Sequence, residues 1–174
     1  PHAALARFLE LYDAFVNALA AHDEQVTLVT DPAQLDAALA SGKIAAVIGV
    51  EGGEVLQGRV AVLRVLHRLG VRLLGLTWNQ RNELADGAGD GRSGGGLSRL
   101  GEQVVREMNR LGMVVDVSHL SDAGFYDVLA VSSQPVLASH SNCRALCDHP
   151  RNLTDDQIRA LAARDGVMGI NFYS

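Results

Sequence analysis

Three short apolar stretches of the chain each end in a side chain that can bind a metal ion: IAAVIGVE (44–51), MVVDVSH (113–119) and PVLASH (135–140). Their last residues are Glu51, His119 and His140. Each stretch is almost entirely apolar rather than alternating, which is typical of a β-strand buried in a parallel sheet. Because the carboxyl ends of parallel strands meet at one edge of a sheet, we expect these three side chains to lie close together.

Further stretches of the same kind define the fold class. RLLGLTW (72–78) and GVMGINF (166–172) also predict strands, VTLV (26–29) is a shorter extended run, and helical patterns separate all of them. This alternation predicts an α/β fold, and both an open three-layer sheet and a closed barrel would satisfy it. The polar residues at the strand ends favour the barrel, whose active sites lie on that face. About five strands are visible where such a barrel has eight, so we expect a partial (β/α)8 TIM-type barrel.

The connections carry clear local signals. Asp31, Ser121 and Thr154 each precede a helical pattern as N-cap residues, and Thr154 with Gln157 forms the pattern of a capping box. The segment 82–96 is rich in Gly and Asp and predicts a loop. A loop that follows a barrel strand is a common position for substrate contacts.

Composition restricts the function classes. The chain has 174 residues, 48% of them hydrophobic, and a net charge of −5. A nucleic-acid partner is not expected, because no cluster of Lys and Arg provides phosphate contacts. No stretch approaches the ~20 apolar residues of a membrane helix, and the sequence favours a cytoplasmic location.

The ends of the chain suggest a piece of a barrel. The sequence begins with Pro1 rather than Met and stops directly after a strand-like segment. We therefore expect one incomplete domain over residues 1–174, without the first strand region and the last strand. Unpaired strand edges and an uncovered interior predict association, such as a homo-oligomer, or low stability. The chain by itself is expected to have little or no turnover.

The three strand-end residues suit a zinc ion. Zinc binds imidazole nitrogen and carboxylate oxygen, and side chains on adjacent strands begin about 5 Å apart. A lone histidine at a sheet edge is more often structural, but two histidines with Glu51 favour a metal site. Asp116 could support one of these histidines or cap the backbone. The other histidines, His2, His22, His67 and His149, are expected to be surface or structural residues. Asn79 and Asn82 either line the mouth of the pocket or form turns in the loop, and the turn is favoured.

Several longer segments resemble one known family: IGVEGGE (48–54), LTWNQRNELADG (76–87), the continuous block 96–121, SHSNCRALCDHPRNL (139–153) and GVMGINFYS (166–174). Taken in this order they are similar to the membrane dipeptidase, or renal dipeptidase, family of zinc peptidases, in a bacterial branch. The resemblance runs from about Lys43 to Ser174. It implies a barrel of the metal-dependent hydrolase kind that holds two zinc ions and cleaves dipeptides with a free C-terminal carboxylate.

The resemblance also implies residue roles. The Glu of the EGG motif bridges both metals and serves catalysis in that family, and it falls on Glu51. The histidines of DVSH and SHS are metal ligands and fall on His119 and His140. The Arg of the PRN segment binds the substrate carboxylate and falls on Arg151, whose planar fork suits that task.

Three departures from the family pattern matter. The first strand of the family carries a His-x-Asp pair for the other metal, and no His-x-Asp occurs in this sequence. The Asp of the last strand is also missing, so we expect at most one well-formed zinc site. Trp78 stands where the mammalian enzyme has a substrate-binding His, and its indole can donate but not accept a hydrogen bond.

Two other functions fit these residues. The same scaffold serves other amidohydrolase-like reactions, such as lactone or amide hydrolysis. A barrel remnant without catalysis would explain the absent ligands.

Overall fold

The main sheet has five parallel strands in sequential order. The computed structural model describes residues 2–90 and 93–172. Its strands, from one edge to the other, are β3 (Ile48–Glu51), β4 (Val71–Gly75), β5 (Val114–Asp116), β6 (Leu137–Ala138) and β7 (Val167–Met168). Every neighbouring pair is parallel. This confirms the expected α/β class and the expected number of barrel strands.

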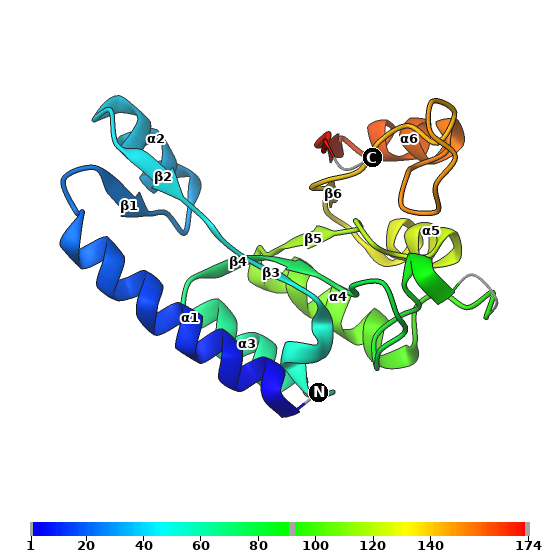
Figure 1. Cartoon of the computed structure of the whole chain (residues 1–174), viewed down its shortest axis with the longest axis horizontal. Helices are drawn as coiled ribbons and strands as arrows, with labels where there is room; N and C mark the ends of the chain where they lie inside the picture. Colours follow the sequence, from blue (N-terminus) through cyan, green and yellow to red (C-terminus); the bar gives the residue numbers. More distant parts are fainter. Residues whose placement is uncertain (1, 91–92, 173–174) are drawn as a thin grey trace.

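Helices return the chain between successive strands and pack against one face of the sheet (Figure 1). They are α3 (Val60–Arg68), α4 (Arg99–Leu111), α5 (Asp122–Val131) and α6 (Asp155–Ala162). The predicted caps are present: Ser121 accepts a hydrogen bond from Gly124 N, and Thr154 with Gln157 forms a capping box. The α4 helix ends at Gly112, which takes the left-handed conformation with φ +70° that glycine adopts without steric cost.

The N-terminal part has its own small sheet, and among its described residues only those of helix α1 (His2–Ala21) pack against the main core. It also contains β1 (Val26–Leu28), α2 (Pro32–Ala40) and β2 (Ile44–Ala46). β1 and β2 form their own two-stranded parallel sheet. The expectation of one continuous strand over 44–51 is therefore wrong: its first half pairs with β1 and its second half with β4. The ladder breaks at Val47 because the two halves have different neighbours.

The core lies between the main sheet and the helices that cover it. Its largest fully buried apolar side chains come from the four covering helices, from β4 and from the segments that follow β3 and β4: Leu56, Leu63, Leu66, Leu74, Leu76, Leu84, Met108, Phe125 and Leu161. The 3-10 helix η1 (Gly53–Leu56) joins this core directly after Glu51, and α1 packs against it. The end of β3 is therefore anchored in the packed part of the molecule.

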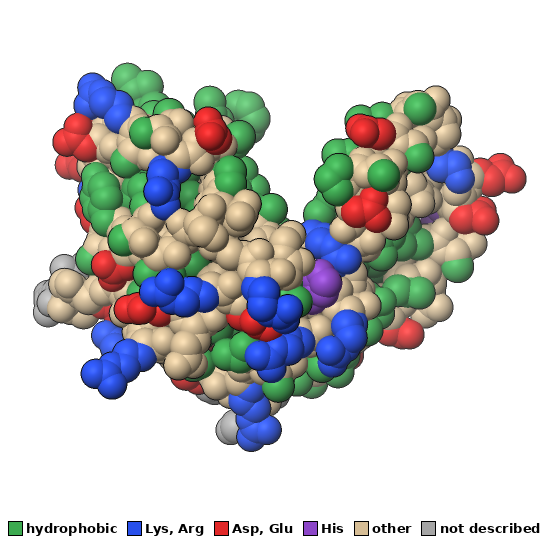
Figure 2. Space-filling model, turned by 180° about the vertical axis from the view of Figure 1, so that it is seen from behind, with side chains coloured by type: hydrophobic (Ala, Val, Ile, Leu, Met, Phe, Trp, Pro, Cys, Tyr) green, Lys and Arg blue, Asp and Glu red, His purple; other side chains and the backbone are tan. Residues whose placement is uncertain are grey.

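The other side of the molecule is open. A broad notch separates two projecting arms, and hydrophobic side chains occur on both (Figure 2). Exposed apolar residues include Ile44, Val47, Val114, Val167 and Ile170. None of the helices in residues 2–90 and 93–172 is long and apolar enough to cross a membrane.

Candidate metal centre

The three candidate ligands stand just beyond or at the ends of their strands. Glu51 is the last residue of β3, whereas His119 and His140 follow β5 and β6 by a few residues. His119 adopts the left-handed conformation, with φ +72°, which is uncommon for a residue other than glycine. Its carbonyl oxygen accepts hydrogen bonds from Ala88 N at 2.7 Å and from Thr77 Oγ1 at 3.2 Å. These contacts hold the turn that aims the imidazole toward Glu51.

The ligand atoms converge on one point. His119 Nε2 lies 2.8 Å from Glu51 Oε1, and His140 Nε2 lies 3.2 Å from the same oxygen. The two Nε2 atoms are 2.9 Å apart. Within the described residues this is the one group of three His, Cys, Asp or Glu side chains close enough to share a metal ion.

This donor set fits a divalent metal. A tetrahedral zinc ion with bonds of about 2.0–2.2 Å separates its ligand atoms by roughly 3.3 Å, close to the spacing of the three atoms here. Two imidazole nitrogens and a carboxylate are the donors that zinc prefers. A cation between them would also satisfy the three electron-rich atoms that face one another.

The charge state of His119 is suited to metal binding. Burial of the imidazole and, to a smaller extent, the nearby Arg151 guanidinium lower the pKa of His119 to about 4, while the Glu51 carboxylate opposes the shift. The ring is therefore neutral at pH 7. Only the neutral imidazole offers a lone pair to a metal ion.

The ring nitrogens that face away from the centre are also held. His119 Nδ1 contacts Asn79 Oδ1 at 3.0 Å, and His140 Nδ1 contacts Ser139 Oγ at 2.7 Å. Asn79 thus takes the alternative role at the pocket, because its side chain contacts a candidate ligand. Asn82 does form a turn, since its Oδ1 accepts hydrogen bonds from Leu84 N and Ala85 N.

A cavity of about 760 Å³ opens beside the metal centre. His119, His140 and the two residues expected to contact substrate, Arg151 and Trp78, all line it. Burial lowers the pKa of Arg151, whereas Asp116 and Glu51 raise it, and the guanidinium remains a cation at neutral pH. Its Nη2 donates to the carbonyl oxygen of His140 at 3.1 Å, and no carboxylate of the described residues forms an ion pair with it. The Arg151 cation therefore faces the same cavity as the two histidine ligands.

Two further residues line this cavity: Trp78, which the sequence predicted there, and His149, which it did not. Trp78 is 54% exposed, and its ring centroid lies 6.4 Å from that of His119. His149 is exposed as expected, but it also lines the cavity, and its Nδ1 accepts the backbone N–H of Arg151. His22 is exposed and His67 is half-buried, away from the cavity lining, and the side chain of His2 lies outside the described part.

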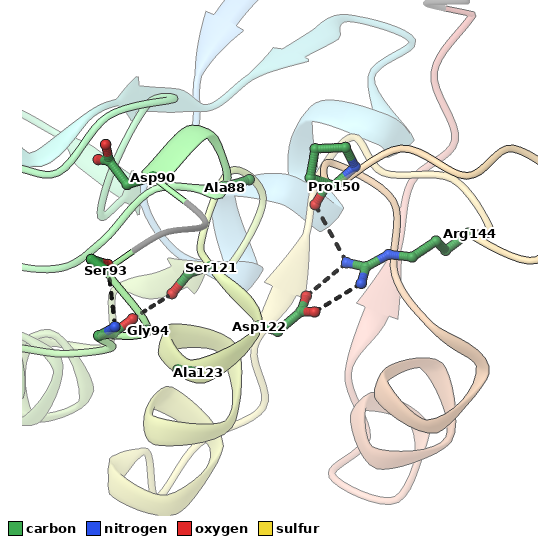
Figure 3. Close-up of a pocket in the computed structure, with 10 residues that line it drawn as sticks. Ala88, Asp90, Ser93, Gly94, Ser121, Asp122, Ala123, Arg144 and Pro150 are labelled. Atoms are coloured by element: carbon green, nitrogen blue, oxygen red, sulfur yellow. Dashed lines mark hydrogen bonds and ion pairs between the residues drawn. The ribbon is translucent and has the colours of Figure 1, made fainter.

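The segment that carries Arg151 is fastened to α5 at a second, smaller cavity of about 320 Å³ (Figure 3). Arg144 forms two parallel hydrogen bonds with the Asp122 carboxylate, at 2.7 and 2.8 Å. The hydrogen bonds from Arg144 lower the pKa of Asp122. Arg144 Nε also donates to the carbonyl oxygen of Asn152 at 2.8 Å, directly after Arg151. The ion pair between Arg144 and Asp122 therefore helps to position Arg151, the cation that lines the larger cavity.

Comparison with known proteins places the chain in a family. Residues 2–174 match the family model described as membrane dipeptidase, peptidase family M19. The chain belongs to the membrane dipeptidase family. The family resemblance found in the sequence is thereby confirmed.

Relatives of this membrane dipeptidase family member are named dipeptidases. Dipeptidase verJ of Clonostachys rogersoniana is 48% identical over 133 residues, which cover 76% of this chain and 34% of that protein. Dipeptidase aclJ of Aspergillus oryzae is 45% identical over 133 residues, covering 76% of this chain and 32% of that protein. The chain thus spans about a third of the length of these relatives.

Solved structures of the family show the same architecture. A metallopeptidase of Rhodobacter sphaeroides, crystallised with a phosphinate mimic of the dipeptide L-Ala-D-Ala, is 31% identical with a TM-score of 0.89. The match covers 94% of this chain and 48% of that chain. The probable dipeptidase PvdM of Pseudomonas aeruginosa is 30% identical with a TM-score of 0.86, over 91% of this chain and 42% of that chain. The partial barrel expected from the sequence is therefore confirmed.

Proposed function

We propose that the protein is a zinc-dependent dipeptidase that hydrolyses the peptide bond of dipeptides with a free C-terminal carboxylate. The observation that carries this proposal is the shared cavity: His119 and His140, two of the three zinc-type ligands, and the Arg151 guanidinium face one space, and Glu51 lies against both histidines. The volume of that cavity lies within the range of small-molecule sites. The dipeptide mimic bound by the Rhodobacter relative supports the same class of substrate.

Each side chain has a distinct task in this reaction. Glu51, His119 and His140 would hold zinc, and the bound ion supplies Lewis acidity to the scissile carbonyl and to the attacking water. Arg151 pairs with the terminal carboxylate through two parallel hydrogen bonds and fixes the position of the peptide bond. Trp78 forms one wall of the cavity, where its apolar surface excludes water.

The metal site is tested by titrating the 174-residue chain with Zn²⁺ in a calorimeter. The parent is expected to bind one zinc ion, and His119→Ala is expected to remove this binding because it deletes a buried ligand. His22→Ala is the control, since His22 is exposed and does not line the cavity. Equal zinc binding by the parent and His119→Ala would refute the site.

A further inference from the structure

A buried carboxylate stands behind His140 on the side away from the metal centre. Asp116, the last residue of β5, is 5% exposed. Its Oδ1 accepts the backbone N–H groups of Ser118 and Ser139, each at 3.0 Å. Its Oδ2 accepts a hydrogen bond from Ser139 Oγ, and that Oγ lies 2.7 Å from His140 Nδ1. A continuous chain of polar contacts thus runs from the end of β5 through Ser139 to the imidazole.

The direction of each hydrogen bond in this chain follows from the donors available. An ionised carboxylate only accepts, so the single hydroxyl hydrogen of Ser139 points to Asp116. The Ser139 oxygen then has only lone pairs left for His140. The short contact at Nδ1 is therefore made by an N–H group of the ring. In the neutral ring, which is the form that binds a metal, the other nitrogen, Nε2, then keeps the free lone pair.

We propose that Asp116 and Ser139 are positioning residues that hold His140 as the Nδ1–H tautomer. This inference rests on the proposed function in one respect: the lone pair on Nε2 is useful because it faces Glu51 and His119 at 3.2 and 2.9 Å. A free imidazole exchanges between both tautomers, and only one of them has its lone pair on that side. The contacts from Asp116 select this tautomer before a metal ion arrives.

The contact at His119 follows the same logic. Its Nδ1 meets the amide oxygen of Asn79, which accepts and cannot donate, so this ring also carries its hydrogen on Nδ1. The two supports differ in kind: a neutral amide stands behind His119 and a carboxylate behind His140.

The first experiment reads the tautomer directly. Long-range ¹H–¹⁵N NMR of the metal-free chain with ¹⁵N-labelled histidine distinguishes Nδ1–H from Nε2–H, and the His140 signals are assigned by their loss in His140→Ala. The parent is expected to show Nδ1–H at His140. Asp116→Asn is expected to invert this state, because an amide N–H would donate to Ser139 Oγ and turn the hydroxyl toward the ring. A parent with Nε2–H at His140, or an unchanged tautomer in both Asp116→Asn and Ser139→Ala, would overturn the inference.

The second experiment measures zinc affinity. Ser139→Ala removes the link but leaves the backbone contacts of Asp116, and it is expected to weaken zinc binding roughly 10- to 100-fold. Ser139→Thr keeps the hydroxyl and is expected to restore most of the affinity. Ser141→Ala is the matched control, because Ser141 is adjacent to His140 and its buried Oγ has no hydrogen-bond partner among the described residues.

The two experiments separate this inference from the proposed function. If Ser139→Ala binds zinc as tightly as Ser141→Ala, the positioning role is overturned, whereas loss of zinc binding in the parent would instead refute the metal site. In that second case the NMR measurement still decides which tautomer the two residues select. Circular dichroism of each variant separates a local effect from unfolding.

Discussion

Arg151 is the residue whose chemistry most directly distinguishes a dipeptidase from other hydrolases on this scaffold. It lines the cavity beside the metal centre, and no acidic partner of the described residues neutralises it. In a catalytically active form of the protein, we expect Arg151→Ala to raise KM for dipeptides roughly 10- to 100-fold. That factor corresponds to about 1.5–3 kcal/mol for hydrogen bonds to a charged group. Steady-state kinetics with a dipeptide and with its C-terminal amide measures the effect.

The C-terminal amide is the internal control. Because it lacks the carboxylate, its KM should change little in Arg151→Ala. Arg151→Lys keeps the charge but not the fork, and an intermediate KM is expected. Equal losses for both substrates would favour lactone or amide hydrolysis instead. Equal losses would therefore remove the dipeptide assignment while leaving the metal centre intact.

The convergence of Glu51, His119 and His140 could be predicted because strand ends in a parallel sheet share an edge, and the strand pattern is local in sequence. The contact between Asn79 and His119 could not be predicted from the sequence. It depends on the left-handed turn at His119 and on the path of the chain after β4, which are set by long-range contacts such as Ala88 N to His119 O. The sequence signal was only the position of Asn79 directly after a strand end.

At the scale of elements, an ion-pair network at the surface fastens α3 to α4. Glu107 on α4 accepts hydrogen bonds from Arg110 at 2.8 Å and from Arg64 of α3 at 2.5 Å. The hydrogen bonds from Arg110 and Arg64 lower the pKa of Glu107 from 4.5 to about 2. The carboxylate is thus more acidic in the folded than in the unfolded chain, so it stabilises the fold above pH 4.5 and loses this effect as the pH falls toward 2.

Glu107→Gln is therefore expected to lower the urea midpoint of unfolding at neutral pH and to match the parent near pH 2. Urea titrations followed by circular dichroism at several pH values measure this. Glu102→Gln on the same helix is the control, because Glu102 meets Arg106 only at 3.7 Å with both side chains largely exposed. A difference from the parent that persisted at pH 2 would contradict this account.

Some boundaries of helices and strands could be predicted from the sequence, and others could not. Thr154 and Gln157 locate the start of α6 because a capping box is a contact between residues three apart. The split of 44–51 into β2 and β3 could not be read in the same way. An apolar run does not say which neighbour each half pairs with, and here the two halves join different sheets.

At the scale of the whole molecule, the covered face of the sheet and the open face have opposite roles. The helices bury the core on one side and so hold β3, β5 and β6 in register at the metal centre. The sheet itself ends at β3 and β7, and parallel strands at an edge present unpaired backbone groups. The same strands that position the ligands thus leave a surface able to recruit another chain.

Association of the 174-residue chain is the expected consequence. Val167 on the edge strand β7 is 62% exposed, and Ile170 beyond it is 74% exposed. Sedimentation velocity over a range of concentrations is expected to show dimers or larger species. Val167→Lys should shift the distribution toward monomer, because a charge on an edge strand opposes pairing with a second edge. Leu146→Lys is the matched control: Leu146 is 89% exposed but lies outside the sheet, and its replacement should leave the distribution unchanged. A monomeric parent at all concentrations, or equal effects of the two substitutions, would show that the open edge does not drive association.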